Sequence, residues 1–400
     1  MNTAIHLCIL CAQHAPDDAR VTHKLGAMFV NSGFRVTWVG PETPVRGTFP
    51  GISFHYFPAG KGGGLWQRLG RSRRLERMCL DLPGISTVKV FFSVEPDSAL
   101  VAIRLARRFS GRAVFDIHEV YHKEGLIDRV PRLSRPLASR LVLRRLRSIC
   151  RQVDLVIGPG RTRVDPYAPA ERKSLIVRHC LTRKAIHEHM ASPFAQARDV
   201  VRIMHGKALY SKGTREVICA MKIAEAMLTS GPPLRLICFD DFGLDQAGGR
   251  KAFQEAVRAE KAEHLIELNT LVPFSEMLSI LSRCDIGVIA YGRECGVNCI
   301  PNRIFEYMAV GLPLIVPSYA IELQPIIERY GCGLAVDTER AESIAEAVVN
   351  LVRDPELAKK MGGAGRIASI EELYMEHEVQ PLIEWIRRPA SALNDRQISE

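Results

Sequence analysis

The sequence contains no apolar run that approaches the roughly 18 to 20 residues needed to cross a bilayer. Its start, MNTAIHLCIL, has no basic segment ahead of the apolar stretch, so it lacks the pattern of a secretory signal peptide. The stretch Ile5–Cys11 has the composition of a buried strand instead. These absences predict a chain without a membrane span, located in the cytoplasm.

The eleven cysteines show no pattern of disulfide or zinc ligands. Cys8 and Cys11 form a C-x-x-C inside one expected strand with no second pair, and Cys295 and Cys299 have no histidine partners at zinc spacing. Asp-x-Asp, which would hold a catalytic metal, is also absent. We therefore expect reduced thiols, no metal and no bound cofactor.

Two further absences exclude classes of ligand. No Gly-x-Gly-x-x-Gly follows an expected strand, and Gly62–Gly64 and Gly158–Gly160 are poor substitutes, which argues against a dinucleotide-binding dehydrogenase. No nucleic-acid module is visible, and aromatic residues are not interleaved with the arginines as single-strand binding requires. We expect no nucleic-acid partner.

Charge is present in quantity and is unevenly distributed. Residues 1–200 carry 32 Lys and Arg against 16 Asp and Glu, whereas residues 201–400 carry 22 against 28. A net charge of +16 on one half and −6 on the other indicates that the halves have different tasks. The basic half favours a polyanionic partner such as a lipid headgroup or a lipid-linked phosphate.

Short apolar strands alternate with helical segments along the whole chain, which predicts parallel α/β layers. The pattern runs once through the first half and restarts near residue 200, so we expect an α/β fold of two Rossmann-like domains. The predicted division is residues 1–190, residues 191–372, and a C-terminal helix and tail at 373–400 that could cross back to the first domain. The expected strands are Ile5–Cys11, Arg35–Gly40, Ile52–Phe57, Lys89–Val94, Ala113–Ile117, Leu155–Gly158, Val201–His205, Leu234–Phe239, Leu265–Leu268, Ile286–Ala290, Leu314–Pro317 and Leu334–Val336.

A first motif, HGKALYSKG, follows the expected strand Val201–His205. Lys207 and Lys212 flank a turn that begins at Gly206 and opens a helix running on from Thr214. Two cations and a helix N-terminus at one place suit a diphosphate. The alternative is a solvated loop whose lysines have no ligand.

A second motif, PNRIFEYMAVGLPLIV, begins at Pro301. Proline suits the first turn of a helix, and Gly311 with Pro313 suits its end. Glu306 in the first turns can accept hydrogen bonds from ribose hydroxyls, unless it is simply a surface glutamate of an amphipathic helix. Ahead of this helix we expect Glu294–Cys299 to form a loop of small residues whose backbone N–H groups could contact phosphate.

These two motifs, in this order and spacing, resemble the donor-binding half of glycosyltransferase family four, a retaining family of the GT-B fold. The family carries Gly-Arg-Leu-x3-Lys-Gly in the first motif. In its capsule and O-antigen branch the second reads Pro-x-Lys-x-x-Glu-Tyr-Met-Ala-x-Gly-x-Pro-Val. The resemblance covers nearly the whole chain. It implies two Rossmann-like domains facing an interdomain cleft, a UDP- or GDP-linked sugar as donor substrate, and metal-independent transfer with retention.

The resemblance also implies roles for individual residues. Lys207 stands where the family has arginine and Lys212 where it has lysine, both on the donor diphosphate, and Glu306 is the ribose carboxylate. The first carboxylate of the family's E-x7-E pair is replaced by Asn298, which can bond a sugar hydroxyl but cannot act as a base; Glu294 is an alternative if the loop shifts register. Lysine also lacks the bidentate fork of arginine. The whole expected donor site is Gly206, Lys207, Lys212, Asn298, Cys299, Asn302 and Glu306.

Two residues of the first half are candidates for the catalytic site. His118 ends the expected strand Ala113–Ile117, where the family places a histidine directed at the transferred sugar, although a histidine there can also simply pack. Asp18 lies in a loop that resembles the Asp-x-Arg-Val segment of the capsule branch. It is a candidate acceptor-side contact or base, or otherwise an N-cap of the next helix.

The first half has two basic stretches: Arg68–Arg77, which follows Trp66, and Arg129–Arg151, which interleaves arginines with Leu, Val and Ile. This composition favours attachment to an anionic membrane surface over an ordinary solvated helix face. We therefore expect a cytoplasmic protein peripheral at the inner face of the cell membrane, moving a sugar to a glycan or lipid-linked acceptor in cell-surface polysaccharide synthesis. The rival hypotheses are a sugar-nucleotide 2-epimerase of the same fold and, because of Asn298, a catalytically silent scaffold of an envelope-assembly complex.

Overall fold

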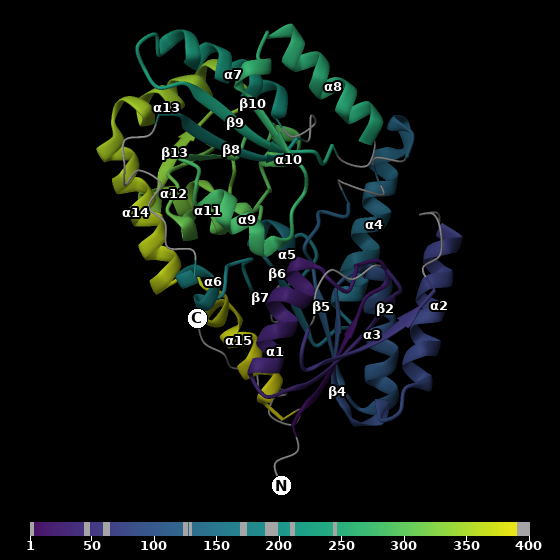
Figure 1. Ribbon diagram of the computed structural model, residues 1–400. Coiled ribbons are helices and arrows are strands. Elements are labelled where there is room, and N and C mark those ends of the chain that lie inside the picture. The colour runs from purple at the N-terminus through teal and green to yellow at the C-terminus, as the bar shows by residue number, and fades with distance from the viewer. Residues whose placement is uncertain are drawn as a thin grey trace. The chain divides into compact units, whose positions relative to one another are not determined.

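The computed structural model describes residues 4–43, 49–58, 65–122, 127, 130–168, 174–188, 199–208, 213–242 and 246–389. The chain divides into two compact units: unit 1 is Met1–His179 with Met375–Glu400, and unit 2 is Cys180–Tyr374. Unit 2 thus begins ahead of the expected residue 191. The C-terminal helix, coloured yellow in Figure 1, belongs to unit 1.

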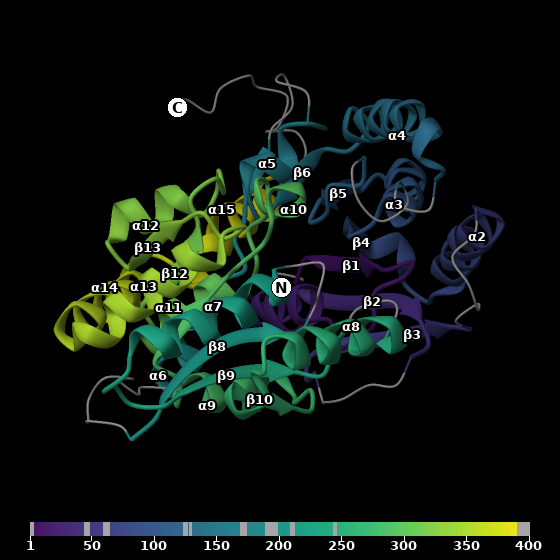
Figure 2. The same cartoon turned by 90° about the horizontal axis from the view of Figure 1, so that it is seen from above.

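Unit 1 is built on a seven-stranded sheet of order β3-β2-β1-β4-β5-β6-β7. All its neighbouring strands run parallel, and β1, β2 and β3 lie side by side in Figure 2. The strand order reverses between β1 and β4, which makes the carboxyl ends of these two strands a switch point. The strands are β1 (His6–Leu10), β2 (Arg35–Pro41), β3 (Ile52–Phe57), β4 (Val88–Ser93), β5 (Arg112–Asp116), β6 (Leu155–Gly158) and β7 (Ser174–Ile176).

Helices alternate with these strands along the chain, and one more helix at the C-terminal end completes the unit. They are α1 (Ala27–Asn31), α2 (Leu65–Asp81), α3 (Pro96–Phe109), α4 (Arg135–Cys150), α5 (Arg161–Val164) and α15 (Met375–Arg387). Short tighter turns occur at η2 (Ile85–Thr87) and η4 (Arg132–Ser134), and a π-helix, η1 (Ala19–Gly26), precedes α1. No helix of the described residues has the length and apolarity to cross a membrane.

The sheet of unit 1 is buried on both faces, as a parallel sheet between helices must be. Successive residues of β4 alternate between two cores: Val90 and Phe92 belong to one and Phe91 to the other. Helix α15 adds Leu382 and Trp385 to the core that contains Val90. The Arg112 guanidinium lies 4.4 Å from the centre of the Trp385 ring and donates to the Trp385 carbonyl, which stabilises the C-terminal end of this helix.

Unit 2 repeats the design with a six-stranded sheet of order β10-β9-β8-β11-β12-β13, again parallel throughout. Its strands are β8 (Val201–Lys207), β9 (Leu234–Phe239), β10 (Ile266–Asn269), β11 (Ile286–Val288), β12 (Leu314–Pro317) and β13 (Gly333–Val336). Its helices are α6 (Arg183–Glu188), α7 (Thr214–Met227), α8 (Gln246–Ala259), the 3₁₀ turn η6 (Glu263–Leu265), α9 (Phe274–Leu281), α10 (Arg293–Gly296), α11 (Arg303–Val310), α12 (Gln324–Tyr330), α13 (Ala341–Arg353) and α14 (Pro355–Glu371).

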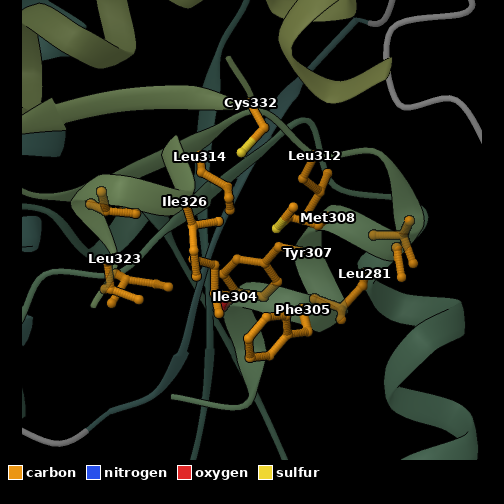
Figure 3. Packing of buried hydrophobic residues seen from close by; sticks show 14 of the residues in the cluster. Leu281, Ile304, Phe305, Tyr307, Met308, Leu312, Leu314, Leu323, Ile326 and Cys332 are labelled. Carbon is orange, nitrogen blue, oxygen red and sulfur yellow. The ribbon is translucent and has the colours of Figure 1, made fainter. Parts of the chain in front are cut away.

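Helix α11 lies in the core of unit 2, as Figure 3 shows for Ile304, Phe305 and Tyr307. Helix α14 crosses its C-terminal end closely, because a Cβ on Gly362 would approach the Gly311 carbonyl oxygen to 2.1 Å. Six of the eight residues of α11 are buried, and Arg303 and Glu306 are the other two. The core therefore fixes the helix that presents these two side chains.

The predicted α/β fold of two Rossmann-like domains is confirmed. All twelve expected strands are present, with ends shifted by up to two residues. The structure adds β7, whose three residues are too few to show a period in the sequence. It also replaces the expected loop Glu294–Cys299 with the short helix α10 followed by a turn. The loop prediction was wrong for Glu294–Gly296, because the Gly296 N–H donates to the Gly292 carbonyl at 2.7 Å and closes a helical turn there.

Candidate functional site

The loop that follows β1 is tied to the end of β4 by one buried carboxylate, Glu95. Glu95 caps α3, and its oxygens accept 2.9 Å hydrogen bonds from the backbone N–H groups of Ala12, Gln13 and His14. The Ser98 hydroxyl donates to it as well, at 2.8 Å. Because the loop backbone is bonded directly, this carboxylate sets the conformation of the chain at the switch point of the sheet.

His14 pairs with this carboxylate and in turn contacts His118. His14 Nδ1 lies 2.6 Å from Glu95 Oε1, and its Nε2 lies 3.0 Å from His118 Nε2. Burial disfavours the imidazolium of His14, but the charge of Glu95 outweighs it and raises the pKa of His14 to about 9. Burial also disfavours the Glu95 carboxylate, yet His14 and the backbone donors lower the pKa of Glu95 to about 2.

His118 follows β5 at the carboxyl edge of the sheet, where the sequence places it. Its ring meets the His14 ring edge-on, with centres 4.8 Å apart. Burial is the main cause that lowers the pKa of His118, and the positive charges of His14 and Arg20 add to it. His118 is therefore a neutral imidazole beside a charged one.

Asp18 caps the π-helix η1, since its Oδ1 accepts from the backbone N–H groups of Arg20 and Val21 at 2.9 and 2.8 Å. This is the N-cap geometry that the sequence offered as the alternative to a catalytic role. Arg20 itself forms a buried bidentate pair with Asp116, at 2.6 and 2.7 Å. The segment after β1 is thereby fixed to the end of β5.

In unit 2 the first motif forms the end of β8. The pairing register shifts between Met204 and Gly206, and Gly206 has a φ of +94°. A Cβ on Gly206 would lie 2.8 Å from Arg303 Nη1, so that guanidinium would have to shift, and the positive φ itself favours glycine. Lys207 follows, exposed by 56%, with its Nζ 2.6 Å from Asp241 Oδ2.

The last residue of the first motif, Gly213, lies at the start of α7. Lys212 falls outside the described residues. Gly213 has a φ of +78°, and a Cβ there would lie 1.4 Å from the Ala290 carbonyl oxygen. The glycine therefore lets the start of α7 approach the end of β11, which holds the N–H groups of the helix at the carboxyl edge of the sheet.

The two motifs meet through Arg303, the first residue of α11. Its Nη1 donates to the carbonyl of His205, at the bulge that precedes Gly206. His205 is buried, and its Nε2 lies 2.9 Å from the Thr214 hydroxyl. Burial, and then the neighbouring Arg303 charge, lower the pKa of His205 to about 3, so this histidine is neutral.

The remaining predicted donor residues lie ahead of α11 or at its start. Asn302 is the N-terminal flanking residue of α11, and Asn298 is partly exposed in the turn between α10 and α11. Cys299 is only 8% exposed and packs in the core. Glu294 lies on α10 and is exposed. Among the described residues no cluster of histidine, cysteine, aspartate or glutamate could hold a metal.

Sequence reasoning missed three residues of these sites: His14, Glu95 and Arg303. The first two are 81 positions apart, and no local pattern joins them. A weak signal existed for Glu95, because an acidic residue directly after a strand and before Pro96 suits an N-cap. Arg303 occupies the lysine position of the family's second motif, so that motif could have identified it.

Comparison with known proteins agrees with this architecture. Residues 19–169 match the family model of a glycosyl transferase 4-like domain, and residues 232–354 match that of glycosyl transferases group 1. No curated protein matches the chain in sequence.

Solved structures match over almost the entire chain at low identity. A sucrose-phosphate synthase from Thermosynechococcus elongatus is 14% identical with a TM-score of 0.74, over 96% of this chain and 98% of its own. Anabaena HepE, solved in complex with UDP, is 12% identical with a TM-score of 0.70, over 96% and 99%. A trehalose 6-phosphate synthase from Burkholderia multivorans is 11% identical with a TM-score of 0.67, over 99% of each chain. With two glycosyltransferase domains in sequence and this fold in space, the chain is a glycosyltransferase of the GT-B type.

Proposed function

We propose that the chain transfers a sugar from a UDP- or GDP-linked donor, with retention of configuration, to a hydroxyl of a glycan or lipid-linked acceptor in cell-surface polysaccharide synthesis. One observation carries the donor half of this proposal: Arg303 joins the two donor motifs, about a hundred residues apart, by bonding the carbonyl ahead of Gly206. This contact supports a common donor site for Lys207, at the end of β8, and Glu306, on α11.

Lys207 and Lys212 have the charge to stabilise a leaving diphosphate without a metal. Lys207 is half-exposed beside Asp241, so its ammonium can exchange a carboxylate partner for a phosphate oxygen. Glu306 would hold the ribose hydroxyls, and Asn298 would bond a hydroxyl of the donor sugar. A UDP-sugar is the first donor to test, because HepE was solved with UDP, with UDP and glucose, and with UDP-glucose.

The test is calorimetric binding of UDP, GDP and their sugars, followed by product analysis. We expect Lys207→Ala to weaken nucleotide binding by about 10- to 100-fold, the value of a charge-assisted hydrogen bond of about 1.5–3 kcal/mol. Glu306→Ala should have a similar effect. The matched controls are Lys251→Ala, on the exposed face of α8, and Glu342→Ala, an exposed first-turn glutamate of α13.

Each alternative outcome is distinct. Failure of every UDP- and GDP-sugar to bind would contradict the donor site and leave a silent scaffold. Turnover of the donor without any acceptor would indicate an epimerase. Equal loss of affinity in Lys207→Ala and Lys251→Ala would show that only overall charge matters.

The acceptor half of the proposal places unit 1 against an anionic membrane at the inner face of the cell. Helix α4 and the turn before it expose Leu133, Leu137 and Leu141 by 99%, 64% and 59%. Leu137 and Leu141 are four residues apart on α4 and so share one side of the helix, and Leu133 lies ahead of them in η4. Arg140 and Arg144 are exposed on the same helix, so apolar and cationic groups could enter the interface together.

Flotation with vesicles of anionic and of neutral lipid tests this surface. We expect binding to anionic vesicles that falls with salt and is reduced several-fold by Leu137→Ser with Leu141→Ser. Ile367→Ser is the matched control, since Ile367 is 56% exposed on α14 in unit 2. Absent or salt-independent binding would remove the membrane from the proposal and leave the donor half intact.

A further inference from the structure

Three titratable side chains form a line at the carboxyl edge of the unit 1 sheet. The Glu95 carboxylate contacts His14 Nδ1 at 2.6 Å, and His14 Nε2 contacts His118 Nε2 at 3.0 Å. Each comes from a different segment: the loop after β1, the end of β4 and the end of β5. The predicted site contained only the last of them.

The 3.0 Å contact between two Nε2 atoms restricts where the protons can be. One nitrogen must donate and the other must accept, because two bare or two protonated nitrogens would repel each other. Either His14 donates as an imidazolium, or a neutral His14 accepts from His118. The choice between them fixes which nitrogen of His118 carries its proton.

The surrounding charges favour the first arrangement. Glu95 is only 3% exposed, and a buried carboxylate without a counter-charge is strongly unfavourable. His14 is also close to Asp18 and Glu119, which favour its imidazolium. On the other side, burial is the main factor that opposes a positive charge on His118; His14 and Arg20 add to it, while Asp116 and Glu119 favour the charge.

If His14 is an imidazolium, a neutral His118 can adopt only one tautomer. Its Nε2 is occupied as the acceptor of the His14 proton, so its single N–H lies on Nδ1. Within the part of the chain that the structure describes, His118 Nδ1 is buried and makes no hydrogen bond. This nitrogen therefore has a hydrogen-bonding capacity that no described protein group uses, which a ligand could satisfy.

We infer that His14 and Glu95 are positioning residues that hold His118 neutral with its only N–H on Nδ1, which makes His118 a fixed hydrogen-bond donor to a substrate hydroxyl and not a base. The identification of the hydrogen-bond partner as a substrate rests on the proposed transferase function, whereas the tautomer of His118 does not. No proton is transferred to or from His118 in this role.

Nitrogen NMR of the full chain, labelled at histidine, tests the tautomer directly. We expect His118 Nδ1 to be protonated and Nε2 bare at about pH 7 to 8, and both nitrogens of His14 to be protonated over the same range. In His14→Leu the ring of His118 should become a mixture of tautomers, and its pKa should rise because a neighbouring positive charge is lost. In His14→Gln the side-chain amide can still donate, so the tautomer should be retained.

Two controls separate this effect from unfolding. His122→Phe changes another partly buried histidine of unit 1, which bonds Tyr167 at 2.8 Å, and should leave the His118 spectrum unchanged. The backbone amide spectrum reports whether each variant keeps its fold. If His118 carries its proton on Nε2 in the unaltered chain, or keeps the Nδ1 tautomer in folded His14→Leu, the inference is wrong.

Turnover supplies an independent readout once a donor is known. We expect His14→Leu to lower kcat at least tenfold with little change in the donor KM, and His14→Gln to recover most of kcat. The predicted tautomer in a chain that binds no nucleotide sugar would contradict the proposed function alone. Transferase activity with the other tautomer would contradict this inference alone.

Discussion

The carboxyl edges of the two sheets differ in the residues that form them. In unit 1 the strands end in charged side chains that neutralise one another, among them Glu95 with His14 and Asp116 with Arg20. In unit 2 the equivalent edge contains glycines that allow close backbone contacts. The side chain of Lys207, at the end of β8, is 56% exposed. Ion pairs within the protein hold side chains in fixed orientations, which suits a site that binds through a few directed hydrogen bonds. Backbone N–H groups and exposed cations suit a diphosphate.

This contrast predicts that unit 2 is most sensitive to added volume. Gly213→Ala should be the most damaging change, because its Cβ would lie 1.4 Å from the Ala290 carbonyl and its φ is +78°. We expect a loss of at least about 4 kcal/mol in the unfolding free energy, or no folded unit 2. Urea denaturation followed by circular dichroism measures it.

The matched control for that change is Gly33→Ala in unit 1. Gly33 has a similar φ of +82°, but nothing lies within 4 Å of the added Cβ. The strain of the backbone alone should cost about 1 kcal/mol. Equal effects at Gly213 and Gly33 would show that conformation and not close approach makes glycine necessary, and the contrast between the units would fail.

Unit 1 should be most sensitive to removal of charge. Arg20→Leu leaves Asp116 buried without a counter-charge and should lower the unfolding free energy by about 3–5 kcal/mol. The same substitution at Arg104 removes an equally bidentate pair with Glu76, at 2.7 Å, whose arginine is 47% exposed. Because solvent screens that pair, its loss should cost less than about 1 kcal/mol.

Denaturation of both variants in low and high salt would sharpen this result. The cost of Arg104→Leu should diminish with salt, and the cost of Arg20→Leu should stay nearly constant. A small effect at Arg20 would mean that the pair contributes little beyond its own desolvation, and the charged edge of unit 1 would then not be what fixes the loop after β1.

The sequence predicted the parts of this molecule that depend on local pattern. Strands buried on both faces are continuous apolar runs, so their positions and the two α/β sets could be identified. The second motif likewise placed Glu306 in the first turns of a helix, where the structure has it. The spacing could not show that His14 lies on Glu95, because tertiary packing alone brings them together.

Other features depend on energies that no pattern reports. The sequence is equally consistent with Asp18 as a helix N-cap and as a contact or base on the acceptor side. Only its 2.9 and 2.8 Å bonds to backbone N–H groups show the capping geometry. The π-helix η1 carries the buried Arg20 and Lys24, which bond partners far along the chain at Asp116 and at the His179 carbonyl. Its unusual winding therefore accompanies contacts made by tertiary structure.

The smallest expected effect concerns two histidines whose pKa values shift in opposite directions, one in each unit. In unit 2 the pKa of His205 falls to about 3 through burial and then Arg303, so the unfolded chain takes up a proton below about pH 6.5 while the folded chain does not. Stability due to His205 is therefore present above pH 6.5 and is lost as the pH falls, by about 2 kcal/mol at pH 5.

His14 of unit 1 should act on the alkaline side, because the charge of Glu95 outweighs the effect of burial and raises the pKa of His14 to about 9. Stability due to this group is fully present below about pH 6.5 and is lost as the pH rises through 9, by about 3 kcal/mol. His205→Asn should flatten the acid slope of the unfolding free energy and His14→Gln the alkaline slope. His6, whose pKa burial and then Arg35 lower to about 4, adds an acid slope common to both variants, so the comparison is between them. If both substitutions flatten the same side of the curve of unfolding free energy against pH, the assignment of His205 as neutral and His14 as charged is wrong.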